Sequence, residues 1–363
     1  MNHHDGQREL EWLPAGQGFA PEALVHWQGK VQGQPLETVL PGVHTVVLGP
    51  HAGVALPGEL RPFIASGLSR RQQYDYADWI TGPLGRAWAA ATPGLLFIEN
   101  PHARLVQDPN RPPPSDPLAM LREFHARLAR QRAGEPGISF AGVDVVRPLS
   151  FAGAEFLPAP PDEAGWQALG RALAQCRRLG WAPYQAAVSE VLERRLALAP
   201  QRPLLLLSLH DTMNTRMGPD GALDQARAPA ERLPDWVNFG NLGDAHGEAP
   251  AGTAESTLSL APQRLRRIVA AWQQALQAPA GAFTLNTPYR GAYETQHWGA
   301  LVRRRGAAGS GALQLEFRRE TLLGAEAVAW LRRPGRDWPP LDTAHLQRTA
   351  QALSQAVLTE VAA

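Results

Sequence analysis

Two histidines and a glutamate stand where apolar stretches end, and their types suit hydrolytic chemistry. His51 and His210 each follow such a stretch, and Glu316 lies near the end of another. Ligands of open α/β sheets bind at the carboxyl ends of the strands, so we predict that these side chains meet there. Two histidines and a carboxylate form a catalytic zinc site that leaves one position for water. A further glutamate would take the proton of that water.

The same residues also have a structural interpretation. A single histidine after a strand often only caps a loop. A buried Glu316 without a catalytic role would need an arginine as its partner, because an unpaired buried carboxylate is costly. Asn110 and Arg111 follow a third strand, and an arginine can hold a substrate carboxylate through two parallel hydrogen bonds. None of these pieces is specific alone, so their order along the chain carries the argument.

The elements that must position these residues alternate between buried strands and amphipathic helices. This alternation predicts an α/β fold with a mixed, largely parallel central sheet flanked by helices. Residues 1–42 are expected to form an irregular N-terminal arm, and residues 43–363 a single domain. Strands are predicted at 43–49, 94–98, 203–209, 283–285 and 312–317, helices at 69–91, 118–132, 162–178, 183–197, 263–278 and 343–361, and a long loop at 219–250. Gly82-Pro83 is expected to end or kink the first helix, with Asp75 and Asp78 on one of its sides.

Composition excludes several classes of function. A formal net charge of +1 gives no basic footprint for nucleic acid. No apolar run approaches the ~18 residues that a membrane span needs. Cys176 is the single cysteine, which excludes internal disulfides and thiolate zinc clusters and fits a reducing compartment. The first residues lack the apolar core of a secretory signal, so we expect a cytoplasmic protein.

Several short motifs occur in a defined order along the chain. They are Pro50–Gly53, Asp78-Trp79, the run from Arg104 to Arg111, Trp181–Tyr184, Ser208–Asp211, the run from Tyr289 to Gly299, and Ala312–Glu316. In this order they resemble the N-formylglutamate amidohydrolase family, which belongs with the zinc carboxypeptidases and aspartoacylases. The family segments are Pro-His-Ser-Gly, Asp-Trp, Arg-Tyr-Val-x-Asp-Leu-Asn-Arg, Trp-x-Pro-Tyr, Asp-x-His-Ser, Phe-Lys-Gly-Gly-Tyr-x-Thr-Arg-His-Tyr-Gly and Ala-x-Gln-x-Glu. The resemblance implies a zinc carboxypeptidase-like fold.

The resemblance also implies a ligand set for zinc. His51 and His210 would bind the ion, and a carboxylate would complete the set. The carboxypeptidase spacing, with a glutamate three residues after the first histidine, fails because Val54 occupies that position. Asp78 is the preferred third ligand, since it falls on the family's Asp-Trp, and Glu59 is the alternative.

Further roles follow from the same resemblance. Glu316 would be the general base that activates water and later protonates the leaving amine. Arg104 would polarise the scissile carbonyl, while Asn110 and Arg111 would bind a substrate carboxylate. Asp108 is expected only to orient its loop.

Arg290 and His297 would lie on the mobile side of the pocket, near the distal end of the substrate. This sequence departs from the family there: Arg290 replaces a lysine and Gln296 an arginine. Ser208 and Asp211 also differ from the family's Asp and Ser around the second histidine. The substrate is expected to be a small molecule that bears a carboxylate. Oligomeric state is not predicted.

Three functions therefore remain open. The first is a zinc amidohydrolase that cleaves an N-acyl amino acid, such as N-formylglutamate, or a related amide with a free carboxylate. The second is a carboxypeptidase-like or ester-cleaving zinc hydrolase of another substrate. The third is a non-catalytic descendant of the fold that binds a ligand. Retention of both histidines and of Glu316 argues against the third.

Overall fold

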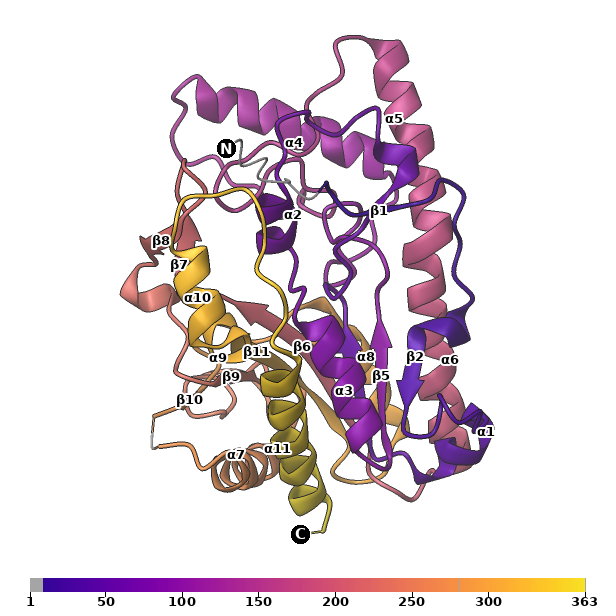
Figure 1. The fold of residues 1–363 in the computed structure, drawn as a ribbon. Helices are drawn as coiled ribbons and strands as arrows, with labels where there is room; N and C mark the ends of the chain where they lie inside the picture. Colours follow the sequence, from indigo (N-terminus) through magenta and orange to yellow (C-terminus); the bar gives the residue numbers. More distant parts are fainter. Residues whose placement is uncertain (1–8, 280, 363) are drawn as a thin grey trace.

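A mixed seven-stranded sheet forms the centre of the protein (Figure 1). The structure is a computed structural model that describes residues 9–279 and 281–362. The strand order is β10-β9-β11-β6-β3-β5-β2. Its four inner parallel strands are β11 (Gly311–Arg318), β6 (Leu205–Thr212), β3 (Thr45–Gly49) and β5 (Leu95–Glu99). The predicted α/β fold with a mostly parallel central sheet is confirmed.

Three outer strands run in the opposite direction. β9 (Val237–Gly240) is antiparallel to β11, β10 (Phe283–Leu285) is parallel to β9, and β2 (Val25–Trp27) is antiparallel to β5. The prediction of a simple loop over 219–250 was wrong, because this segment supplies β9 and the short strand β8 (Leu223–Ala226). β9 has no long apolar run, so its pairing partners, rather than its local pattern, determine that it is a strand.

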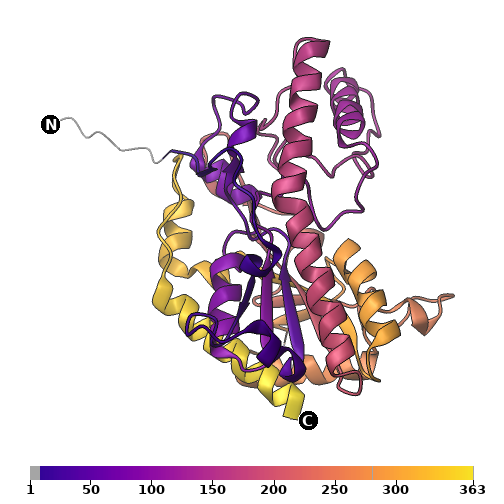
Figure 2. The same ribbon diagram turned by 90° about the vertical axis from the view of Figure 1, so that its right-hand side faces the viewer.

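The alternation of side chains along β6 assigns each of them to one of two helical layers. Leu205, Leu207 and Leu209 pack in the core on the side of α3 (Thr81–Ala91), α7 (Pro262–Ala275) and α11 (Thr343–Ala362). Leu204 and Leu206 pack on the opposite side, with α6 (Ala182–Leu198) and α8 (Tyr293–Arg305). Figure 2 shows α3 and α11 on one side of the molecule and α6 and α8 on the other. Because side chains alternate between faces, Ser208 and His210 point toward the α6 and α8 layer.

The helix predicted over 69–91 is two helices, α2 (Arg70–Tyr76) and α3. The interruption covers residues 77–80 and does not fall at Gly82-Pro83. Pro83 lies in the first turn of α3, where its missing N–H would have had no helical acceptor. Asp78 therefore lies in the break between the helices, and the predicted common helix face with Asp75 was wrong.

Most of the remaining elements lie toward the end of the sheet that carries the site (Figure 1). α5 (Glu163–Cys176) continues through a π-helical turn, Arg177–Trp181, into α6, and together they form the long helix in Figure 2. Residues 1–8 of the predicted arm lie outside the described residues, and the rest of the arm supplies β1, α1 and β2. The other elements are β1 (Trp12–Leu13), α1 (Leu36–Val39), β4 (Leu56–Pro57), α4 (Pro117–Arg132), β7 (Thr215–Met217), α9 (Arg319–Leu323) and α10 (Ala325–Leu331). Among the described residues, no helix combines the length and apolarity needed to cross a bilayer.

Candidate active site

A cavity of ≈ 320 Å³ opens at the carboxyl ends of β3, β6 and β11. His51, His210 and Glu316 line it, as the strand-end argument predicts, and so does Asp78, which lies between two helices. Tyr76, Phe151, Met213, Met217 and Tyr289 add apolar surface to the wall. The cavity therefore combines a group of titratable side chains with room for a small molecule.

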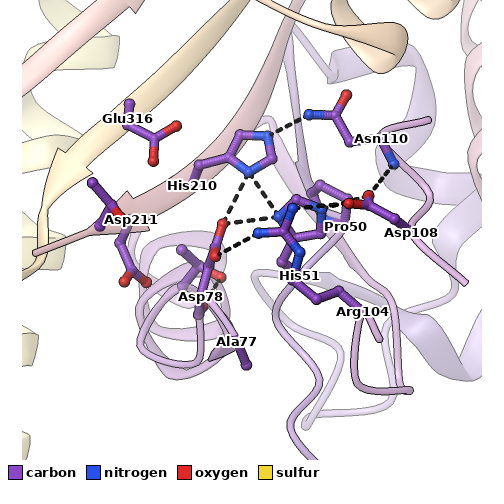
Figure 3. Close-up of polar contacts among 12 residues, drawn as sticks. Pro50, His51, Ala77, Asp78, Arg104, Asp108, Asn110, His210, Asp211 and Glu316 are labelled. Carbon is purple, nitrogen blue, oxygen red and sulfur yellow. Dashed lines mark hydrogen bonds and ion pairs between the residues drawn. The ribbon is translucent and has the colours of Figure 1, made fainter. Parts of the chain in front are cut away.

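Three atoms in this cavity converge on one another. The Nδ1 atoms of His51 and His210 each lie 3.0 Å from Asp78 Oδ2 and 3.1 Å from each other. Figure 3 shows the three side chains pointing toward one another from separate parts of the chain. The three residues are at most 4% exposed. The structure thus brings together the predicted ligands and places Asp78 with them. Glu59, the alternative, lies apart and accepts a hydrogen bond from the Gly16 backbone N–H.

Local features of the chain hold the Asp78 segment in place. The Asp78 N–H donates to the carbonyl of His51, which joins the break between α2 and α3 to the loop after β3. Arg319, at the start of α9, donates from Nη2 to the Ala77 carbonyl at 2.7 Å and forms an ion pair with Asp211. The backbone next to Asp78 is therefore fixed from two directions.

The outer nitrogen of His51 contacts a carboxylate. His51 Nε2 donates to Asp108 Oδ1 over 2.7 Å, and Arg104 bridges Asp108 and Asp78 with its two terminal amino groups. Asp108 also accepts from the N–H of Asn110, so it orients its loop as predicted. Its contact with His51 goes beyond that prediction. A carboxylate on the far nitrogen is typical of histidines that bind metal ions.

The outer nitrogen of His210 contacts polar groups of a different kind. The Ser208 hydroxyl oxygen lies 3.0 Å from His210 Nε2, and Asn110 Nδ2 lies 3.3 Å from it. Ser208 donates its own proton to Glu294 Oε2, and Tyr184 donates to Glu294 Oε1, both over 2.7 Å. The sequence analysis missed Glu294, because it occupies the variable position of the family's Tyr-x-Thr segment. One signal was available in the sequence: Ser208 and His210 are two residues apart at the end of one predicted strand, so their side chains share a face.

These outer contacts favour a metal ion at the point where the three atoms converge. Since Asp108 accepts the Nε2 proton of His51, the inward Nδ1 of His51 carries a lone pair. Asp78 contributes an acceptor-only oxygen at the same point. Zinc takes imidazole and carboxylate ligands in this way, and the chain supplies three of them. The three residues form a closely spaced His-Asp-His group, and their chemistry therefore fits a metal ion.

The electrostatics of the three side chains suit this role. Burial lowers the pKa of His210 to about 4, despite the adjacent Asp78 carboxylate, so His210 is neutral near pH 7. Burial opposes ionisation of Asp78, but His51, His210 and Arg104 outweigh it and hold the pKa of Asp78 below its usual range. For His51, burial and Arg104 lower the pKa while Asp108 and Asp78 raise it, and the net direction is upward. A proton on His51 thus competes with a metal ion.

Glu316 is adjacent to this group. It is the register partner of His210 on the neighbouring strand, and Gln314 Nε2 donates to its Oε2 over 3.1 Å. Among the described residues it forms no ion pair with an arginine, which the structural interpretation required. Burial and the negative charges of Asp78 and Asp211 raise its pKa well above the usual range. Its carboxyl is therefore poised to carry a proton.

The other predicted residues have different surroundings. Asn110 and Arg111 line the cavity, and Arg111 donates from Nε to Asp144 at 3.0 Å. Arg290 lines the cavity too, but it is exposed and donates to the carbonyls of Leu242 and Gly243. His297 is not among the residues that line the cavity. It is exposed on α8 and stacks on Tyr293 at a centroid distance of 5.0 Å.

Comparison with known proteins identifies the family. The model of the N-formylglutamate amidohydrolase family matches residues 43–323. The chain belongs to this family. Membership supports an enzyme that hydrolyses an amide bond, and it confirms the resemblance drawn from the motifs. No curated protein matches the chain.

A solved structure agrees with this chain at the level of the fold. An N-formylglutamate amidohydrolase from Ralstonia eutropha is 16% identical, with a TM-score of 0.52, and the match covers 88% of this chain and 93% of that one. A gene product of Agrobacterium tumefaciens is 14% identical, with a TM-score of 0.46 and coverage of 88% and 91%. At these identities the likeness to the Ralstonia structure describes the fold, and the function must be argued from the site.

Proposed function

We propose that this member of the family is a zinc-dependent amidohydrolase of N-acyl amino acids or related amides that carry a free carboxylate. The observation that carries the proposal is the convergence of His51 Nδ1, Asp78 Oδ2 and His210 Nδ1 on one point of the cavity. His51, Asp78 and His210 would hold the ion. Bound there, zinc would act as a Lewis acid and lower the pKa of an attacking water from ~15.7 to about 7. The predicted kinship with the zinc carboxypeptidases stays a prediction.

Glu316 would move the proton that amide cleavage requires. It would first accept a proton from the attacking water and then deliver it to the departing nitrogen. Its position opposite His210 on the neighbouring strand supports this role, as does its single hydrogen bond, from Gln314, among the described residues. A raised pKa makes the ionised carboxylate a stronger base toward the attacking water, and the carboxyl formed is then the acid that protonates the leaving amine.

Arginines would bind and polarise the substrate. Within the described residues, Arg104 Nε is buried and has no hydrogen-bond acceptor, so one donor of this cavity-lining side chain is unused. We propose that Arg104 stabilises the developing oxyanion. Arg111, whose Nη2 makes no hydrogen bond with another described residue, would bind the substrate carboxylate with Asn110, and Arg290 would face the distal end.

Hydrolysis assays test this proposal. The protein would be assayed with N-formyl and N-acetyl amino acids and with matching amides whose carboxylate is blocked. We expect turnover of the free acids that disappears after zinc is removed with a chelator and returns when zinc is added. Equal turnover of the blocked amides would contradict the carboxylate requirement, and undiminished turnover after complete metal removal would contradict the metal mechanism.

A further inference from the structure

Glu294 is a fully buried carboxylate to which the proposed reaction assigns no role. Its exposed fraction is 0%, and it forms no ion pair with any described residue. It lies in the first turn of α8, where a negative charge interacts favourably with the helix dipole. That interaction does not require burial, and burying a carboxylate without a cation is costly. The reason for the burial of Glu294 must therefore lie in its contacts.

Two hydroxyl groups occupy both oxygens of Glu294. Tyr184, from α6, donates to Oε1, and Ser208, from β6, donates to Oε2, each over 2.7 Å. Tyr184 and Ser208 are 0% and 1% exposed. In addition, the backbone N–H of Glu294 donates to Asn110 Oδ1 over 3.0 Å. An ionised Glu294 can only accept, so its contact with Ser208 directs the Ser208 proton toward Glu294.

The direction of that proton determines what Ser208 offers to His210. With its proton committed to Glu294, the Ser208 oxygen can only accept from His210 Nε2, 3.0 Å away. A ring proton on Nε2 satisfies this oxygen, and it leaves the Nδ1 lone pair facing His51 and Asp78. A histidine binds a metal ion only through such an unprotonated nitrogen.

The second neighbour of His210 Nε2, Asn110, shows why the Glu294 carboxylate matters. Its Oδ1 accepts from the Glu294 N–H, so its Nδ2, 3.3 Å from His210 Nε2, is a donor and opposes a ring proton on Nε2. Of the two neighbours of Nε2, only the Ser208 oxygen can accept that proton. Without the Glu294 carboxylate, Ser208 would be free to donate to Nε2 as well. Both neighbours of Nε2 would then be donors, and the ring proton would move to Nδ1, where it blocks the metal ligand.

We propose that Glu294 is a positioning residue that, through the Ser208 hydroxyl, holds His210 in the tautomer able to bind the metal ion. The proposal rests on the metal site of the proposed function. The family segment Asp-x-His has a carboxylate at the position that Ser208 occupies in this chain. In this chain the Glu294 carboxylate, on α8, acts on His210 through the Ser208 hydroxyl.

Zinc affinity tests the proposal directly. The apoprotein would be titrated with zinc alone, in competition with a chromophoric chelator, and folding would be checked by circular dichroism. We expect Glu294→Gln to weaken zinc binding by about 10–100-fold, the range typical of lost partners of metal-binding histidines. The glutamine amide would donate to one of the hydroxyls and leave Ser208 able to donate to His210.

A rescue variant separates positioning from general damage. Adding Ser208→Asp to Glu294→Gln places an acceptor-only group beside His210 Nε2, so we expect zinc affinity to recover most of the loss. Glu360→Gln is the matched control, because Glu360 is also buried but pairs with Arg264. We expect that variant to bind zinc like the parent protein.

The outcomes distinguish the relay from the metal site itself. A folded Glu294→Gln protein with parental zinc affinity would overturn the relay alone, and so would a double variant that is folded yet no better than the single one. A parent protein that binds no zinc would overturn the metal site of the proposed function, and the relay with it.

Discussion

The proposed metal-binding side and the proposed substrate-binding side of the cavity are held to different degrees. On the metal-binding side, His51, Asp78 and His210 are at most 4% exposed and contact one another. On the substrate-binding side, the Arg111 side chain is 31% exposed and Arg290 is exposed. The first side is set by the fold before any ligand binds, while the second can change with less consequence for the rest of the molecule. Variants on the two sides should therefore affect different quantities.

The largest effect on turnover is expected at Glu316. Glu316→Gln keeps the shape of the side chain and removes the proton carrier, so kcat should fall by about 10²–10⁴-fold. Zinc content and melting temperature should stay close to those of the parent, because Glu316 forms no ion pair with the described residues. Steady-state kinetics and elemental analysis of the same sample check both points. A variant that holds zinc and turns over at the parental rate would remove Glu316 from the mechanism.

Asp108→Asn should act on the metal instead. The amide of the new side chain could present a donor to His51 Nε2 where Asp108 presents an acceptor, so zinc affinity should fall by about 10–100-fold. Comparison with Glu294→Gln shows whether a direct carboxylate and one relayed by a serine hold their histidines equally well. An unchanged zinc dissociation constant in the folded Asp108 variant would count against the role of this contact.

A smaller effect is expected at Arg111. Arg111→Lys keeps the charge but loses the paired donors of the guanidinium, so KM for substrates with a carboxylate should rise by about tenfold, or ~1.4 kcal/mol. The expected rise in KM is no larger because Arg111 is partly exposed, and water weakens its contact with a substrate carboxylate. Zinc affinity should not change, which is the sign of a substrate-side residue. Equal kinetics of parent and variant on every carboxylate substrate would place the anion contact elsewhere.

The smallest effect is expected at His297. The structure places it on the exposed face of α8, stacked on Tyr293 and outside the cavity. His297→Ala should leave kcat/KM within a factor of about two, as for most surface changes. A loss much larger than this on a full substrate panel would mean that α8 contributes His297 to the substrate-bound site.

The sequence predicted which residues gather at the proposed metal site better than which residues gather on the proposed substrate-binding side, for physical reasons. His51 and His210 follow apolar strands, and the ends of parallel strands meet wherever such a sheet forms. Asp78 was found only through its motif, since it lies in a helix break that Arg319 stabilises from far along the chain. Glu294 and β9 were missed because their positions depend on pairing with distant segments. Whether the predicted division at residue 42 separates an arm from a domain stays a prediction, although β2 joins the central sheet.

Metal content tests the central claim most directly. The parent protein and His210→Ala would be purified side by side and analysed for bound metal, with circular dichroism to confirm that both are folded. The account predicts about one zinc per chain in the parent and essentially none in the variant, because His210 supplies one of three protein ligands. Equal zinc in the two folded proteins, or a parent that binds no divalent ion even when zinc is supplied, would contradict it.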